Sequence, residues 1–165
     1  IPCNTAHYFY EGLQRACSIP IVNIIEETVK ALHAAGIRRF GLLATEGTAR
    51  SGAYARISAS FGMECLLPTQ AEQEILSTII YDEVKQNRTP DPARLEAVAS
   101  ALLARGCERL VLGCTELSLL KPRLQKAECY LDALEVLALR TILACQKTPI
   151  GFSDPLLRSG KEDFV

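Results

Sequence analysis

The sequence lacks the patterns that mark several special classes of protein. No run of apolar residues approaches the length of roughly 18 that a membrane-spanning helix needs. Lys and Arg number 18 against 19 Asp and Glu, and the net charge of −1 leaves no basic excess for a nucleic-acid surface. Hydrophobic residues make up 48% and charged residues 22%, which is typical of a globular domain and excludes a disordered chain. The sequence therefore predicts neither a membrane partner nor a nucleic-acid partner.

Cysteine pairs of the zinc-binding type are also missing. The sequence has no Cys-x-x-Cys, and neither His7 nor His33 joins two cysteines at a zinc-type spacing. The cysteines are odd in number and form no disulfide framework, so we expect a reduced, cytoplasmic chain without a metal site. Most of them should be small buried hydrophobic residues. The seven cysteines lie at positions 3, 17, 65, 107, 114, 129 and 145.

An initiator methionine is absent from the start of the sequence. The chain opens on Ile1-Pro2-Cys3, and its only methionine is Met63. No signal-peptide pattern stands at the beginning. We therefore expect this chain to be the C-terminal part of a longer protein, or a processed chain.

Short apolar runs alternate with helical patterns along the chain, which predicts an α/β fold with a mostly parallel sheet. We expect strands at residues 19–25, 39–44, 63–67, 109–112 and 128–131, and helices at 6–17, 26–35, from the turn at 45–48 to about 61, 70–85, 92–105 and 133–146. Thr69 with Glu72 has the form of a capping box, and Asp91 and Asp132 mark two further helix starts. The last residues, 148–165, show no clear pattern.

Two short motifs place a cysteine where the chain leaves a strand and enters a helix. They read Pro2-Cys3-Asn4-Thr5 and Gly113-Cys114-Thr115-Glu116, and their cysteines are 111 residues apart. A helix start favours the thiolate form and offers free N–H groups to a carboxylate. Proton exchange at a carbon stereocentre needs two such acid/base groups on opposite faces, together with donors that stabilise the carbanion.

These motifs resemble a known family of enzymes. Pro2–His7 and Leu112–Leu117 are similar to the two signature cysteine motifs of the aspartate/glutamate racemases, and the segments 43–48 and 81–85 resemble that family too. The resemblance covers about residues 1–146. It implies a cofactor-independent enzyme with two similar α/β lobes, each a parallel sheet flanked by helices, with the site between the lobes. It also implies a homodimer and an acidic amino acid as the substrate.

The resemblance also implies roles for particular residues. Cys3 and Cys114 match the catalytic cysteines. Lys85 matches a lysine that pairs with the side-chain carboxylate in the aspartate-specific members, and an ammonium group is a suitable partner for it. We therefore expect an aspartate racemase. The residues expected to bind substrate are Asn4, Thr5, Ala6, Thr48, Lys85 and Thr115.

The sequence departs from the family at its beginning. A glycine-rich opening and an arginine that binds the distal carboxylate normally precede the first cysteine, and neither is present. We expect residues 1–37 to be the remainder of an incomplete first lobe and 38–130 to form the second lobe. Residues 131–147 would form a helix that returns to the first lobe, and 148–165 a tail.

Several alternatives remain open from the sequence. The enzyme could be a broad-specificity Asp/Glu racemase or an isomerase of another carboxylate, such as maleate or a hydantoin. The chain could also be a truncated, non-catalytic lobe that binds a carboxylate or forms a dimer, or a redox sensor. Among single residues, Asn4 and Thr5 could cap a helix, Lys85 could complement a helix end, and Glu116 could stabilise a helix start or assist Cys114. His7 could pack or assist in acid/base chemistry.

Overall fold

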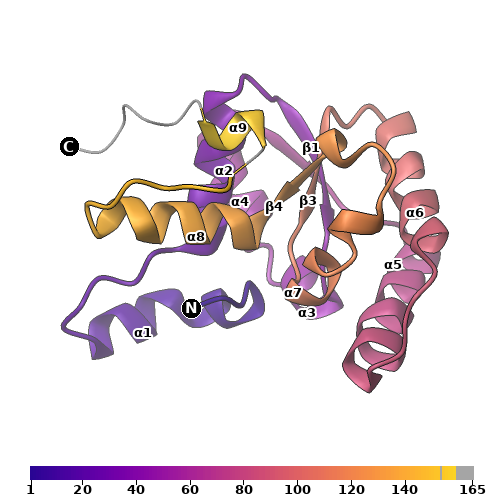
Figure 1. Cartoon of the computed structure of the whole chain (residues 1–165), viewed down its shortest axis with the longest axis horizontal. Coiled ribbons are helices and arrows are strands. Elements are labelled where there is room, and N and C mark those ends of the chain that lie inside the picture. The colour runs from indigo at the N-terminus through magenta and orange to yellow at the C-terminus, as the bar shows by residue number, and fades with distance from the viewer. Residues whose placement is uncertain (153, 159–165) are drawn as a thin grey trace.

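The computed structural model describes residues 1–152 and 154–158 and contains, in this part of the chain, a four-stranded parallel sheet (Figure 1). The strands are β1 (Arg39–Leu43), β2 (Glu64–Leu66), β3 (Arg109–Leu112) and β4 (Tyr130–Asp132). Their order is β2-β1-β3-β4, and every neighbouring pair is parallel. The predicted α/β class with a parallel sheet is confirmed.

The strand order creates one special position on the sheet. The chain runs from β1 outward to β2 on one side and from β3 outward to β4 on the other. Leu43 is paired with Leu112, and Leu112 with Asp132, so the carboxyl ends of the three strands are level. In open parallel sheets, ligands bind where the strand order reverses, outside the carboxyl ends of the strands. Here that position lies between β1 and β3.

Helices cover both faces of the sheet. One face carries α2 (Ile24–Ala34), α4 (Ala53–Ser60) and α8 (Ala133–Ala144), which pack on Phe40, Leu42 and Val111. The other face carries α5 (Gln70–Ser77) and α6 (Pro92–Ala104), which pack on Leu43, Leu110 and Leu112. Successive side chains of each strand point to opposite faces of the sheet. Both faces are apolar because helices cover both of them, as expected for a parallel sheet.

Shorter elements connect these layers. A 3-10 helix, Thr5–Phe9, leads into α1 (Tyr10–Ala16), which divides the helix expected over 6–17. The helix that begins at Gln70 changes to a π-helical segment at Thr78–Glu83, followed by a 3-10 turn at Val84–Gln86. The other short elements are α3 (Glu46–Arg50), α7 (Thr115–Ser118), the 3-10 turns Lys121–Arg123 and Ala127–Cys129, and α9 (Pro155–Arg158), the last within the expected tail.

The strand predicted at 19–25 is wrong. Ile24 and Ile25 form the first turn of α2, since the Asn23 side chain accepts hydrogen bonds from the backbone N–H groups of Ile25 and Glu26. Asn is one of the strongest N-cap residues, and the buried isoleucines face the core from a helix. The capping box at Thr69 and the starts at Asp91 and Asp132 are confirmed.

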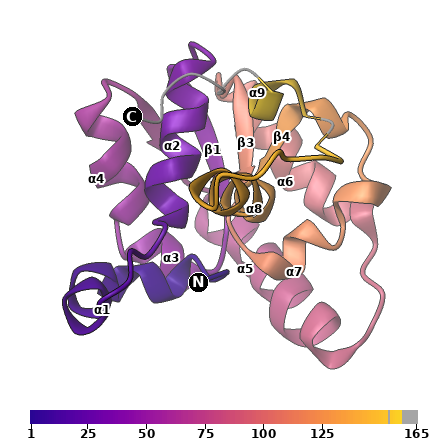
Figure 2. The same cartoon turned by 60° about the vertical axis from the view of Figure 1, so that its left-hand side comes forward.

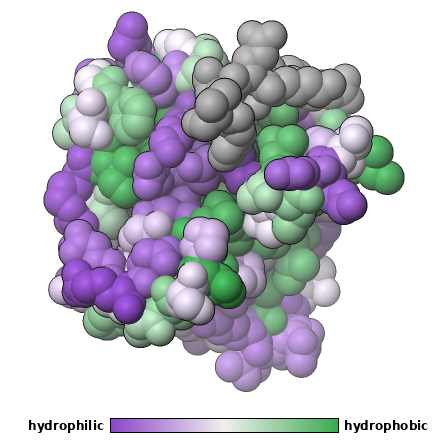
Figure 3. Space-filling model, turned by 90° about the vertical axis from the view of Figure 1, so that its left-hand side faces the viewer, coloured by the Kyte–Doolittle hydropathy of each residue, from purple (hydrophilic) through white to green (hydrophobic). Residues whose placement is uncertain are grey.

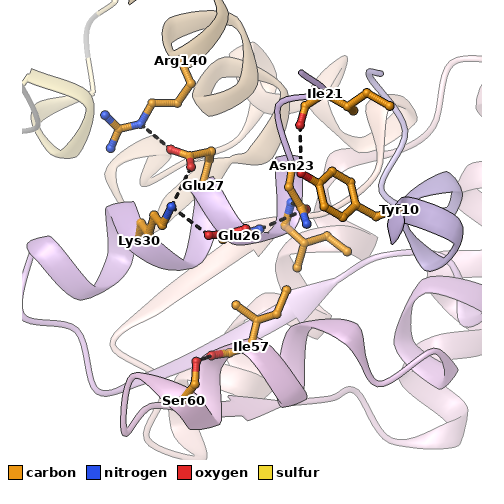
Figure 4. A network of polar contacts seen from close by, with 10 residues as sticks. Tyr10, Ile21, Asn23, Glu26, Glu27, Lys30, Ile57, Ser60 and Arg140 are labelled. Carbon is orange, nitrogen blue, oxygen red and sulfur yellow. Dashed lines mark hydrogen bonds and ion pairs between the residues drawn. The ribbon is translucent and has the colours of Figure 1, made fainter. Parts of the chain in front are cut away.

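Charged side chains join α2 to α8. Figure 4 shows Arg140 of α8 reaching Glu27 on α2, with Lys30 between Glu27 and Glu26. The Arg140 Nε and Glu27 Oε2 atoms are 3.1 Å apart, and both side chains are largely buried. Lys30 Nζ lies 3.1 Å from Glu27 and 2.8 Å from Glu26. These contacts hold residues 24–34 and 133–144 together, while the division of the chain into lobes stays a prediction.

One side of the molecule has a mixed surface. Figure 3, which faces the left-hand side of Figure 1, shows hydrophobic residues in small groups among hydrophilic ones. Such mixing is usual for a protein surface. In the described parts of the chain, no helix is long and apolar enough to cross a membrane.

Candidate active site

The N-terminal segment lies at the carboxyl end of the sheet. Figures 1 and 2 both show the N-terminal segment close to α3. Three hydroxyls make the connection: Thr5 Oγ1 lies 2.8 Å from Thr48 Oγ1 and 3.1 Å from Thr45 Oγ1, and the latter two are 3.0 Å apart. Thr45 caps α3 directly after β1, so this cluster fixes the segment that holds Cys3 against the end of β1.

Two further contacts fix the backbone around Cys3. The Tyr54 hydroxyl donates a 2.7 Å hydrogen bond to Asn4 Oδ1. His7 Nδ1 donates to the Cys3 carbonyl oxygen at 2.8 Å, and the Ile24 N–H donates to His7 Nε2 at 3.4 Å. His7 is buried, and both ring nitrogens face backbone groups, which supports a packing role for it. The Cys3 side chain itself is exposed.

The second half of the site is built around Cys114. This residue follows β3 directly and is the N-cap of α7, with 8% of its surface exposed. Its Sγ–H donates a 2.9 Å hydrogen bond to Glu116 Oε2, and Thr115 Oγ1 donates to the same oxygen at 3.0 Å. Lys85 Nζ lies 3.8 Å from Glu116 Oε1 and 4.5 Å from the centre of the Tyr81 ring. The structure therefore brings Lys85, Thr115 and Cys114 together around Glu116, and their roles in binding and catalysis stay predictions.

Burial controls the electrostatics of this cluster. It raises the pKa of Cys114 to about 12, and the neighbouring Glu116 carboxylate contributes to the rise, while the Glu116 N–H and Lys85 oppose it. Burial also favours a raised pKa for Glu116, but bonds from Cys114, Thr115 and its own N–H, with the Lys85 charge, lower it overall. Cys114 is therefore a thiol at neutral pH that donates to a charged carboxylate.

Asp132 fixes the segment after Cys114. Its Oδ1 atom accepts hydrogen bonds from Ser118 Oγ at 2.8 Å and from the Leu134 N–H at 2.9 Å. Ser118 Oγ also lies 3.4 Å from the Cys114 carbonyl oxygen. Burial raises the pKa of Asp132, although both of these donors act in the opposite direction. Asp132 thus caps α8, as predicted, and in addition ties α7 to the end of β4.

The two halves meet where β1 and β3 end. The Gly113 N–H donates a 2.8 Å hydrogen bond to the Leu43 carbonyl oxygen. A Cβ atom on Gly113 would lie 2.9 Å from the Leu42 side chain and 3.2 Å from Ala44 Cβ, so a larger residue would force its neighbours to shift. The pairing of β1 with β3 places Thr45 and Cys114 on adjacent strand ends.

Two hollows of the described part of the chain lie away from the two thiols. One of about 550 Å³ is lined by His7, Tyr10, Arg56 and their neighbours on α1, α2 and α4. Another of about 250 Å³ lies beside Lys30 and Arg140. Within the described residues, no group of three His, Cys, Asp or Glu side chains is placed to hold a metal ion.

Residues 1–141 match the family model for Asp/Glu/hydantoin racemases. The chain belongs to this family. It is 28% identical over 144 residues to the broad specificity amino-acid racemase RacX of Bacillus subtilis (strain 168), and 30% identical over 155 residues to the glutamate racemase of Shewanella sp. (strain MR-4). These matches cover 86% and 90% of this chain but 62% and 56% of the two racemases, so the chain spans little more than half their length.

Solved structures of the racemase family share the fold. An aspartate racemase homologue from Pyrococcus horikoshii OT3 superposes with a TM-score of 0.74 at 25% identity, covering 88% of this chain and 65% of that chain. The aspartate racemase of Picrophilus torridus gives a TM-score of 0.66 at 24% identity, covering 89% and 61%. These matches confirm the parallel α/β fold.

The sequence analysis missed three residues that help to form the candidate site. Thr45 joins the hydroxyl cluster, Tyr54 contacts Asn4, and Ser118 links Cys114 to Asp132. Thr45 had a visible signal, because a Thr between a strand and a helix is a favoured N-cap. Tyr54 and Ser118 carry no local signal of this kind.

Proposed function

We propose that this member of the racemase family interconverts L- and D-aspartate by proton transfer between Cα and two thiols, without a cofactor. The observation that carries the proposal is the Cys114 thiol, buried at the position where the strand order reverses and bonded to a carboxylate that pairs with an ammonium group. The segment that holds Cys3 is fixed to the same edge of the sheet by Thr5.

The chemistry needs one thiolate and one thiol on opposite faces of the substrate. The thiolate removes the Cα proton, and the thiol then gives its own proton to the other face. Each turnover therefore exchanges the two protonation states, and the reverse reaction uses the thiols in the opposite order. The negative charge that develops next to the α-carboxylate needs fixed donors, and Asn4, Thr5, Ala6, Thr48 and Thr115 are the candidates.

The environment of Cys114 supports its role as the proton donor of the resting enzyme. Burial raises its pKa to about 12, so the group stays a thiol until a base takes its proton. The carbanion at Cα is the base that takes this proton, and the bond from the Cys114 S–H to Glu116 at 2.9 Å orients the thiol before the reaction. In the reverse reaction the Cys114 thiolate takes the Cα proton back.

Lys85 supports an acidic substrate. An ammonium group has three donors, and its pairing with Glu116 leaves room for a second carboxylate. The Lys85 side chain is 43% exposed, so a bound amino acid can reach it. The relatives named a broad specificity racemase and a glutamate racemase support the alternative that glutamate is also accepted.

The test is racemisation in deuterated water without pyridoxal phosphate. L-aspartate and L-glutamate are incubated in turn with the natural protein, and D-amino acid carrying deuterium at Cα is measured by chiral chromatography and NMR. We expect D-aspartate to form faster than D-glutamate, and the double variant Cys3→Ala/Cys114→Ala to form neither. Cys17→Ala, which removes an exposed cysteine, is the matched control. The absence of deuterated product with either substrate would favour a non-catalytic, carboxylate-binding lobe.

The proposal includes a homodimer in the cytoplasm. All seven cysteines are free in the structure, which supports a reducing compartment. Analytical ultracentrifugation of the natural protein tests the dimer: a single species of twice the chain mass is expected.

A further inference from the structure

Tyr54 connects the core to the N-terminal segment. It is in the first turn of α4 and is 1% exposed, with its ring 6.3 Å from that of Phe40 in an edge-on arrangement. Its hydroxyl donates the 2.7 Å hydrogen bond to Oδ1 of Asn4, which is 5% exposed. The residue that follows Cys3 is therefore held by a rigid, buried phenol from a distant part of the chain.

This bond fixes the orientation of the Asn4 amide. A carboxamide is planar, with an acceptor oxygen on one edge and two N–H donors on the other. With Oδ1 held by Tyr54, the Nδ2 group must point away from Tyr54. In the described part of the chain, no group accepts a hydrogen bond from Asn4 Nδ2, so its donors are left for a ligand.

The Tyr54 hydroxyl is a constant donor. Burial raises the pKa of Tyr54 well above its usual value, so the hydroxyl keeps its proton at every working pH. A reversed Asn4 amide would present its oxygen to a bound carboxylate, which repels it. In the orientation that the structure shows, the Tyr54 hydroxyl donates to Oδ1 and the Nδ2 edge of the amide can attract an anion.

We propose that Tyr54 is a positioning residue, whose hydroxyl holds the Asn4 amide so that Nδ2 faces the α-carboxylate of the substrate. This inference rests on the proposed function, since it takes Asn4 as a substrate contact. According to this inference, a core residue that cannot reach the substrate contributes to carboxylate binding. Tyr54 acts only through Asn4.

The kinetic test uses a double-mutant cycle in the natural protein. Tyr54→Phe keeps the ring packing and removes only the hydroxyl. We expect it to raise the KM for aspartate about 3- to 10-fold, the value of one ordinary hydrogen bond, with kcat changed less than about 2-fold. In an Asn4→Ala background, Tyr54→Phe should have no further effect. An unchanged KM in Tyr54→Phe, or additive losses in the double variant, would overturn the inference.

Tyr10→Phe is the matched control. Tyr10 also donates a phenol hydrogen bond, at 3.1 Å to the Ile21 carbonyl oxygen (Figure 4). Its ring stacks on that of His7, a contact that phenylalanine keeps. We expect the kinetic constants of Tyr10→Phe to equal those of the unchanged protein. A loss as large as that of Tyr54→Phe would mean that any missing phenol has this effect, which would contradict a specific role.

A second measurement does not depend on activity. The side-chain NH₂ resonances of Asn4 are followed by ¹⁵N NMR in the absence of substrate. Tyr54→Phe should shift them and Tyr10→Phe should not. If the resonances shift but no amino acid is racemised, the proposed function fails while the Tyr54 bond to Asn4 stands. If they do not shift, the inference fails whatever the activity.

Discussion

The two thiols of the candidate site lie in opposite environments. Cys114 is buried at the end of a central strand, and its position is fixed by the sheet itself and by bonds to Glu116 and, through Ser118, to Asp132. Cys3 is exposed, and its segment is held by side-chain contacts to residues 45–54 and by His7. The proposed reaction uses the two thiols in equivalent roles, but their environments differ. Cys114 directly follows a strand of the sheet, whereas Cys3 lies in a segment that packs against the end of the sheet.

The largest expected difference between the two thiols is their reactivity. Only the thiolate reacts with iodoacetamide, and a pKa of about 12 gives Cys114 about 10³-fold less thiolate at pH 8 than a free cysteine has. We expect exposed Cys3 to be alkylated at least 100-fold faster than Cys114, as measured by peptide mass spectrometry over time. Equal alkylation rates at Cys3 and Cys114 would contradict the difference between the environments of the two thiols.

Glu116 and Lys85 should shift the reactivity of Cys114 in opposite directions. The Glu116 carboxylate raises the pKa of Cys114 and the Lys85 ammonium lowers it. Glu116→Gln should therefore move the pH dependence of Cys114 alkylation to lower pH, and Lys85→Met should move it to higher pH. Cys3 alkylation serves as the internal control and should not move. Shifts of the same sign in both variants would contradict the arrangement.

Asp132 should give the smallest effect, on stability alone. Its pKa is raised by burial, so the native state binds the proton more tightly than the unfolded state. The stability from that proton is complete below the unfolded pKa of about 4 and is lost as pH rises through the higher native value. Asp132→Asn keeps an oxygen for Ser118 and Leu134, and it should remove this decline of stability in urea unfolding measured between pH 4 and 7. A steeper loss of stability with rising pH in the variant would contradict a raised pKa for Asp132 in the native state.

The half of the site that belongs to the sheet could be predicted from the sequence. The apolar runs that became β1 and β3, and the glycine and cysteine after β3, are local patterns with a direct physical meaning. Lys85 and Thr48 were named from the resemblance, and the structure places Lys85 beside Glu116 and Thr48 beside Thr5.

The contacts of the segment that holds Cys3 could not be predicted from local sequence patterns. Tyr54 meets Asn4 across 50 positions of sequence, and neither residue shows its partner in the local pattern. The apolar run at 19–25 indicated a strand because period and composition alone do not reveal that Asn23 caps a helix there. Contacts between side chains far apart in sequence are decided by packing, which a single sequence does not display.

Exchange from each pure enantiomer tests the central claim most directly. A variant that keeps one thiol can remove and return a proton on one face only, so it can exchange one enantiomer with deuterium but cannot racemise it. We expect Cys3→Ala to label one enantiomer of aspartate and Cys114→Ala to label the other, with racemisation lowered by about 10³-fold in both. Labelling of the same enantiomer by both variants, or full racemisation by either, would contradict a two-thiol mechanism.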